Sequence, residues 1–280
     1  MRFLKMNGAG NAFAIFDARE KGRLTLAEDQ AAAIAKATRA DQVIAMEPSG
    51  EADVFMRIWN ADGSEVGACG NAARCVAWFL MNETGHSRLT IATTGGNLRA
   101  ERAGEHAITI DMGPPKLDWT EIPLEERMDT RGIDLKIGPI DNPVLQLPGA
   151  VNMGNPHVVF FVEDAEKAPA ETVGRMIERH PLFPEGVNVG FAEVQAPDRI
   201  RLRVWERGAG LTKACGTGAC AALVAAHRRR MCERKASVIV DGGELLIDWR
   251  EDRPSGTGRV FMTGPAETSF TGAVALGPLA

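Results

Sequence analysis

The sequence predicts an α+β protein of two pseudo-symmetric domains, each a mixed sheet wrapped around a central helix. One short segment that occurs twice carries this prediction: Arg57-Ile58-Trp59 leads to Cys69-Gly70, and Arg203-Val204-Trp205 leads to Cys215-Gly216. The step from Trp to Cys is ten residues in both copies (69 − 59 and 215 − 205), and the copies are 146 residues apart (205 − 59). A run of β-formers, a polar glycine-containing loop and an apolar run of small residues indicate strand, loop and helix in each copy.

Further elements recur in the same order in both halves. A Gly-Asn pair opens a buried strand, a helical pattern follows, a second strand precedes the repeated segment, a Gly-Gly hairpin comes after it, and a strand ending near Met and Gly-Pro closes each half. These pairs are 10–16 and 154–160, 26–39 and 170–179, 41–44 and 187–190, 91–98 and 239–245, and 112–114 and 262–265. The order predicts a gene-duplicated chain with two equivalent lobes.

The boundaries of the lobes follow from the two segments of the sequence that do not belong to the repeat. The segment 114–148 is rich in proline and is expected to cross between the domains, and 269–279 has no counterpart in the first half. This last segment is expected to return a strand to the first domain. We therefore predict an N-terminal lobe of residues 1–116 plus 266–280 and a C-terminal lobe of residues 117–265.

Composition excludes several classes of protein. The 280 residues are 45% hydrophobic and 25% charged, as in ordinary globular proteins. The net charge of −5 argues against general binding of nucleic acid or of anionic membranes. No apolar run approaches the roughly 18 residues of a membrane span, and the start shows no secretory apolar region. Five cysteines, an odd number in a long chain, indicate reduced thiols and a cytoplasmic protein.

Two of the cysteines are candidate catalytic groups. Cys69 and Cys215 are expected at helix N-termini, where backbone N–H groups and the helix dipole favour a thiolate and can lower its pKa from about 8.5 to roughly 3.5–7.5. Two such thiols on either side of a shared cleft would suit moving a proton from one face of a carbon to the other. Cys75, Cys220 and Cys232 lie in or at the end of apolar runs and are interpreted as buried small hydrophobes.

No metal or cofactor is expected. The cysteine spacings, six residues from Cys69 to Cys75 (75 − 69) and five from Cys215 to Cys220 (220 − 215), do not resemble a zinc or dithiol motif. The glycine-containing loops lack the spacing of a dinucleotide fingerprint or a P-loop. No lysine stands in a context that indicates pyridoxal phosphate.

Polar residues at the strand exits point to an amino-acid site. Asn60 directly follows Trp59, and Glu206-Arg207 directly follows Trp205. Ordinary turn chemistry and a surface ion pair are the alternatives for these positions. Beside the cysteines, however, an arginine suits a carboxylate, which it binds bidentately, and a glutamate suits an ammonium group.

The chain closely resembles the diaminopimelate epimerase family over essentially its whole length. The resemblance lies in the motifs at 5–11, 60–71, 153–157 and 206–220, the last of which is highly specific. The chain departs from the family pattern at Ala12, at Ala72 and in Thr38-Arg39-Ala40, which lacks the usual glycine. These departures are expected to alter loop packing more than chemistry.

The resemblance implies a fold of mostly antiparallel sheets and an activity. That activity is the cofactor-independent interconversion of L,L- and meso-diaminopimelate in lysine and peptidoglycan precursor synthesis in a bacterial cytoplasm. Cys69 and Cys215 would be the base and the acid, in an order that the sequence leaves open. The implied partner is the small-molecule substrate, and a homodimer is a further expectation. The implied substrate contacts are Asn11, Gln42, Asn60, Gly70, Asn71, Asn155, Asn188, Glu206, Arg207, Gly216 and Thr217.

Two other readings stay open at this point. A proline or hydroxyproline racemase also uses two cysteines, but its substrates lack a second amino-acid end. Asn60, Glu206 and Arg207 favour a substrate that has such an end. A thiol redox sensor is the alternative from a different class, since cysteines across a cleft can form a disulfide.

Overall fold

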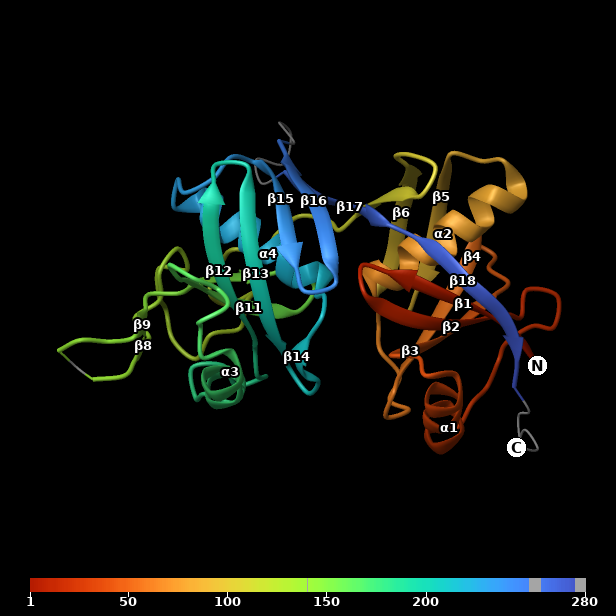
Figure 1. Ribbon diagram of the computed structural model, residues 1–280, viewed down its shortest axis with the longest axis horizontal. Coiled ribbons are helices and arrows are strands. Elements are labelled where there is room, and N and C mark those ends of the chain that lie inside the picture. The colour runs from red at the N-terminus through yellow and green to blue at the C-terminus, as the bar shows by residue number, and fades with distance from the viewer. Residues whose placement is uncertain (140, 252–257, 275–280) are drawn as a thin grey trace. The chain divides into compact units, whose positions relative to one another are not determined.

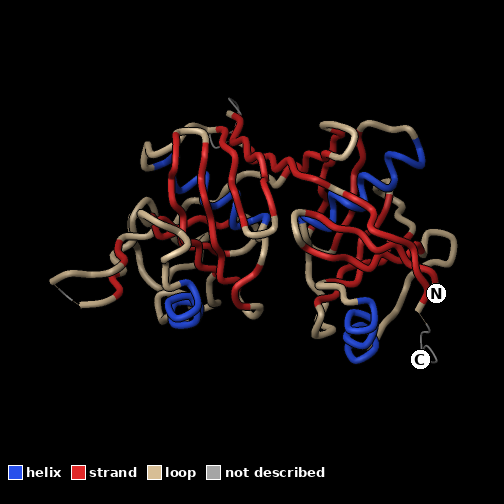
Figure 2. Tube along the Cα trace, in the orientation of Figure 1, coloured by secondary structure: helices blue, strands red, loops and turns tan. Residues whose placement is uncertain are grey.

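A computed structural model describes residues 1–139, 141–251 and 258–274. The chain divides into two compact units, which we call the first lobe (Met1–Asp111 with Thr263–Ala280) and the second lobe (Met112–Met262). Residues 275–280, which the predicted N-terminal lobe includes, lie outside the described part. In each lobe strands surround one buried helix (Figures 1 and 2).

The first lobe is a mixed sheet with strand order β7-β6-β5-β4-β3-β2-β1-β18. The pairs β2–β3 and β4–β5 are parallel, whereas β1–β2, β1–β18, β3–β4, β5–β6 and β6–β7 are antiparallel. This confirms the mixed, mostly antiparallel sheet that was expected. Its elements are β1 (Arg2–Gly8), β2 (Asn11–Asp17), α1 (Glu28–Thr38), β3 (Gln42–Glu47), β4 (Val54–Asn60), α2 (Gly70–Thr84), β5 (Arg88–Thr93), β6 (Gly96–Arg102), β7 (Ala107–Asp111) and β18 (Glu267–Ala273).

The second lobe repeats this plan with strand order β10-β11-β12-β13-β15-β16-β17, and the short β14 pairs with β13. Here the pairs β11–β12 and β13–β15 are parallel, as β2–β3 and β4–β5 are in the first lobe. Its elements are β8 (Lys136–Ile137), β9 (Leu145–Gln146), β10 (Gly149–Asn152), β11 (Pro156–Phe161), α3 (Ala170–Glu178), β12 (Asn188–Ala196), β13 (Arg199–Glu206), β14 (Gly210–Thr212), α4 (Gly216–Arg228), β15 (Lys235–Val240), β16 (Gly243–Arg250) and β17 (Arg259–Pro265), which ends in the first lobe.

Strand register confirms the internal duplication. Val43 pairs with Trp59 in the first lobe, and Val189 pairs with Trp205 in the second, an offset of 146 at both partners (189 − 43 and 205 − 59). The parallel neighbours match as well, because Gln42 stands opposite Phe13 and Asn188 stands opposite His157. Equivalent residues of the two copies therefore leave their sheets at equivalent points.

The two central helices are buried nearly all round, as their apolar sequences indicate. Buried residues occupy consecutive positions 71–77 of α2 and 218–226 of α4. The cysteine is the N-cap of each helix rather than its first helical residue, because Cys69 and Cys215 have extended backbone angles and the helices begin at Gly70 and Gly216.

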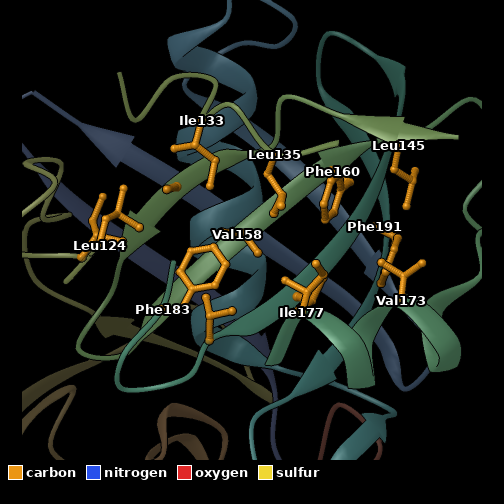
Figure 3. Packing of buried hydrophobic residues seen from close by; sticks show 14 of the residues in the cluster. Leu124, Ile133, Leu135, Leu145, Val158, Phe160, Val173, Ile177, Phe183 and Phe191 are labelled. Atoms are coloured by element: carbon orange, nitrogen blue, oxygen red, sulfur yellow. The ribbon is translucent and has the colours of Figure 1, made fainter. Parts of the chain in front are cut away.

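The proline-rich segment 114–148 differs from its prediction as a crossing. It supplies Ile122, Leu124, Ile133, Leu135 and Leu145 to the core of the second lobe, where they pack with side chains of β11, β12 and α3 (Figure 3). Burying these large aliphatic side chains is favourable by about 1.5–3 kcal/mol each. The segment is thus a structural layer of that lobe.

The C-terminal strand confirms the return to the first lobe. β18 lies antiparallel to β1, with Arg2 opposite Ala273 and Asn7 opposite Glu267. Among the described residues, none of the helices is long and apolar enough to cross a bilayer.

Candidate functional site

Cys69 lies where the loop after β4 meets α2. The loop is fixed by backbone hydrogen bonds, since Asn60 N donates to Ser64 O at 2.9 Å and Val66 N donates to Ile58 O at 3.0 Å. At its end the Cys69 Sγ accepts a hydrogen bond from the Ala72 N–H at 3.5 Å, and the side chain is only partly buried. A sulfur that caps a helix N-terminus in this way is placed where negative charge is stabilised.

The polar residues of the first lobe form two pairs. Gln42 and Asn60 stand opposite each other on β3 and β4, and Gln42 Nε2 donates to Asn60 Oδ1 at 3.0 Å. Asn71, in the first turn of α2, donates from Nδ2 to Asn11 Oδ1 at 2.6 Å. The fully buried Arg74 donates from Nη1 to Asn71 Oδ1 at 2.8 Å and thereby fixes which end of the amide faces Asn11.

In the second lobe, a series of polar groups in contact with one another surrounds the equivalent cysteine. Cys215 is 4% exposed, and its Sγ lies 3.5 Å from Thr217 Oγ1. The Thr217 hydroxyl is 3.1 Å from His157 Nε2, which is itself 2.9 Å from Asn155 Oδ1. Because an amide oxygen only accepts, this arrangement requires that Nε2 carries the imidazole proton.

The thiol of Cys215 does not show the lowered pKa that its helix N-terminus predicts. Burial raises its pKa well above the ordinary value, and the neighbouring Glu206 carboxylate raises it further. The hydrogen bonds from Thr217 and from the Gly218 N–H act in the opposite direction but are outweighed. The prediction of a lowered pKa is therefore wrong for Cys215, because desolvation of a buried thiolate costs more than the helix terminus supplies.

Burial also sets the charge of the two titratable neighbours. Desolvation raises the pKa of Glu206, although the hydroxyl of Thr212 donates to its carboxylate and the Cys215 thiol is a further hydrogen-bond partner. Burial and, second, the charge of Arg207 lower the pKa of His157 to about 3. The imidazole is thus neutral at physiological pH.

Asn188 and Arg207 meet at the exit of β13. Asn188 is 3% exposed; its Oδ1 accepts from the Arg207 N–H at 3.0 Å, and its Nδ2 donates to Pro156 O at 2.8 Å. The Arg207 Nη1 donates to the backbone carbonyls of Glu185 and Gly186 at 2.5 and 3.5 Å.

The structure joins several candidate residues by hydrogen bonds within their own lobes, and it adds three residues that sequence reasoning did not assign. His157 links Asn155 to Thr217, Arg74 holds Asn71, and Thr212 holds Glu206. A histidine and an arginine within otherwise apolar runs were the available signals for the first two. Nothing in the sequence pointed to Thr212, because it is the pairing of the short strand β14 with β13 that brings it beside Glu206.

The remaining cysteines confirm their interpretation as core residues. Cys75 and Cys220 are fully buried and Cys232 nearly so. Burial raises the pKa of Cys75 to about 12 and that of Cys232 to about 11. All five cysteines are reduced thiols. Within the ranges that the structure describes, no three His, Cys, Asp or Glu residues are grouped to hold a metal ion.

Comparison with solved structures defines the class of fold. A Bacillus anthracis phenazine biosynthesis protein of the PhzF family superposes with a TM-score of 0.70 over 98% of this chain and 99% of its own, at 16% identity. A probable proline racemase from Agrobacterium radiobacter, with bound carbonate, gives a TM-score of 0.70 over 99% and 93%, at 18% identity. The chain thus has the duplicated fold that these proteins share.

Sequence comparison identifies the family within that class. The diaminopimelate epimerase family model matches residues 3–117 and 149–269. Diaminopimelate epimerases from Phenylobacterium zucineum and Acidiphilium cryptum are 56% and 54% identical, over 96% of this chain and 96% and 95% of their own. This chain belongs to the diaminopimelate epimerase family.

Proposed function

We propose that this chain is an isomerase that interconverts L,L- and meso-diaminopimelate, without a cofactor, in the supply of lysine and peptidoglycan precursors. The observation that carries the proposal is the pair of N-capping cysteines, Cys69 and Cys215, at equivalent positions of a duplicated chain of this family. We propose the two lobes as its functional units and the bacterial cytoplasm as its location.

The substrate groups match the polar residues around the cysteines. Arg207 suits a carboxylate and Glu206 an ammonium group, and the amides of Asn11, Gln42, Asn60, Asn155 and Asn188 supply further donors and acceptors. The N–H groups at Gly70-Asn71 and Gly216-Thr217 begin the two helices, where they suit an α-carboxylate. Negative charge builds on that carboxylate when the α-proton leaves, and each well-placed donor is worth about 2.7–4 kcal/mol in comparable sites.

The unlike surroundings of the two sulfurs support unlike resting states. Cys215 is buried beside Glu206, and both effects keep its proton in place. Cys69 is partly exposed and accepts the Ala72 N–H, which favours a thiolate. In one direction of the reaction, Cys69 takes the α-proton and Cys215 delivers its thiol proton to the opposite face of the same carbon. In the other direction the roles are exchanged.

A homodimer is the proposed assembly. Among the described residues β18 is the last strand of the sheet of the first lobe, and Phe270 on this strand is 53% exposed. Exposed edges and apolar side chains are common at interfaces between identical subunits. Light scattering of the purified protein measures its molar mass in solution. If the Phe270→Asp variant has the same dimeric mass as the wild type, the dimer interface does not involve β18.

A stereochemical assay tests the function. Purified protein with reductant and no added cofactor is incubated separately with L,L-diaminopimelate, L-proline and trans-4-hydroxy-L-proline, and the stereoisomers are separated by chromatography. We expect turnover of diaminopimelate alone, since only this substrate has a second amino-acid end for the polar residues described above. Turnover of proline without turnover of diaminopimelate would contradict the proposal.

A further inference from the structure

Helix α3 fixes the short segment that carries Glu206 and Arg207. Glu178, the last residue of α3, is buried, and its carboxylate accepts one hydrogen bond from each end of this segment. Its Oε2 accepts from the indole Nε1 of Trp205 at 2.7 Å, and its Oε1 accepts from the backbone N–H of Gly208 at 3.0 Å. Hydrogen bonds to an ionised acceptor are about twice as strong as neutral ones.

Close packing between α3 and Trp205 makes this contact possible. A Cβ at Gly174 would lie 2.4 Å from Trp205 Cγ, so the indole rests directly on the helix where no side chain intervenes. Gly174 and Glu178 are four residues apart and therefore lie on the same face of the helix. The guanidinium of Arg175 lies 6.0 Å from the centre of the indole ring.

The loop after α3 holds the side chain of Arg207 in the same way. The Glu185 and Gly186 carbonyls accept from Arg207 Nη1, and the Val187 N–H returns to Glu178 O at 3.0 Å. The turn itself is closed by the Ala209 N–H, which donates to Glu206 O at 3.1 Å. The C-terminal end of α3 and the loop after it thus hold both the backbone and the side chains of the segment 205–208.

The first lobe closes the equivalent loop without such a carboxylate. The last residue of α1 is Thr38, where α3 has Glu178, and the Thr38 hydroxyl donates to Ile34 O at 2.7 Å. There the loop after Trp59 is held by its own residues, since Gly63 N donates to Asn60 O at 3.0 Å and Ser64 N donates to Asp62 Oδ1 at 3.0 Å. The carboxylate is therefore an addition of the lobe that bears Glu206 and Arg207.

We propose that Glu178 is a positioning residue that orients Glu206 and Arg207 for the substrate. The inference rests on the proposed function, which gives those two residues the charged groups of diaminopimelate. A carboxylate accepts from both donors at once. A carboxamide of the same shape accepts at one oxygen and turns an NH2 group toward the other N–H donor, so that one of the two hydrogen bonds is lost.

The test compares Glu178→Gln with Glu171→Gln, the same change at an exposed position of the same helix. For Glu178→Gln we expect KM for diaminopimelate to rise about ten-fold while kcat changes less than about three-fold; ten-fold is about 1.4 kcal/mol of binding. We also expect faster hydrogen exchange at the Gly208 amide. Glu171→Gln should change neither quantity. A merely structural role would lower the unfolding midpoint and leave KM at its wild-type value, which would overturn the proposal.

A second variant keeps the proposal testable if Glu178→Gln does not fold. Trp205→Phe removes the indole donor and leaves the bond from Gly208, so a smaller rise in KM, about two- to three-fold, is expected; an unchanged KM would overturn the positioning role. Wild-type protein that does not epimerise diaminopimelate would overturn the proposed function itself. Wild-type protein that epimerises, with no KM change in the variants, would overturn the role of Glu178 alone.

Discussion

The two lobes share a backbone plan but surround their cysteines differently. In the first lobe Asn71 contacts Asn11 directly, and a buried arginine lies beneath the pair. In the second lobe His157 stands between Asn155 and Thr217. The position equivalent to Arg74 is Cys220 (74 + 146), and the position equivalent to Asn60 is Glu206 (60 + 146).

This difference teaches that the duplication sets where the sulfurs lie, whereas burial and the neighbouring Glu206 set the protonation of Cys215. Both cysteines cap a helix, so the helix dipole is common to both. Cys215 is also buried beside a carboxylate. The proposed epimerisation needs one thiolate and one thiol, and the unlike surroundings of the two cysteines suit that assignment.

Removing either sulfur should have the largest effect. Cys69→Ala and Cys215→Ala each delete one of the two proton carriers, and general acid–base groups typically contribute about 10²–10⁴-fold. We expect epimerisation to fall at least 10³-fold in both variants, measured by chromatography of the stereoisomers. Cys232→Ala, a matched change at a core cysteine, should retain activity. Substantial turnover by either of the first two variants would remove both cysteines from the chemistry as a pair.

Making the second lobe resemble the first at position 206 should have the next largest effect. Glu206→Gln removes the carboxylate charge that raises the pKa of Cys215, so that pKa should fall. In a Cys69→Ala background, Cys215 should react with iodoacetamide at lower pH than it does with Glu206 present. In the otherwise wild-type chain, activity should fall about 10²-fold because a substrate contact is lost as well. Glu244→Gln, on an exposed hairpin, is the control; an unshifted alkylation profile would contradict the account.

Replacing Arg74, the buried residue that donates to Asn71, should destabilise the first lobe. Arg74→Met removes a fully buried guanidinium that donates to Asn71 and to Pro265 O. Leaving buried acceptors unsatisfied costs about 1–3 kcal/mol each, so we expect a loss of about 3 kcal/mol in urea unfolding. Cys220→Ala, at the equivalent place in α4, removes one apolar atom and should cost roughly 1 kcal/mol. Equal losses would show that the arginine network adds no stability.

Replacing His157 by the residue type of its first-lobe counterpart should flatten the pH dependence of stability. The folded-state pKa of His157, about 3, lies below the usual 6.5. Between these values the unfolded chain binds a proton that the folded chain does not, so stability is full above about pH 6.5 and falls toward pH 3 by at most about 1.4 kcal/mol per unit. His157→Phe, which copies the residue type of Phe13 in the first lobe, should remove this contribution from unfolding curves. A slope as steep as that of the wild type would assign the acid sensitivity to other groups; the exposed His86→Phe is the control.

Much of this arrangement could be predicted because it follows the repeated spacing. The strands before the cysteines and the central helices follow from the repeated segment and its 146-residue offset. The protonation of Cys215 could not be predicted, since the spacing does not show that this thiol is buried beside the Glu206 carboxylate. The packing of 114–148 was also missed, because its prolines obscured the aliphatic residues that enter the core.

Deuterium incorporation during the first turnovers tests the asymmetric pair most directly. L,L-diaminopimelate is incubated in heavy water with protein equilibrated in the same solvent, and the recovered substrate and the product are analysed by mass spectrometry at low conversion. If one sulfur removes the α-proton and the other delivers a solvent-derived one, the product carries one deuterium and the recovered substrate carries none. Equal labelling of substrate and product would mean that a single group both removes and returns the proton, and would contradict the account.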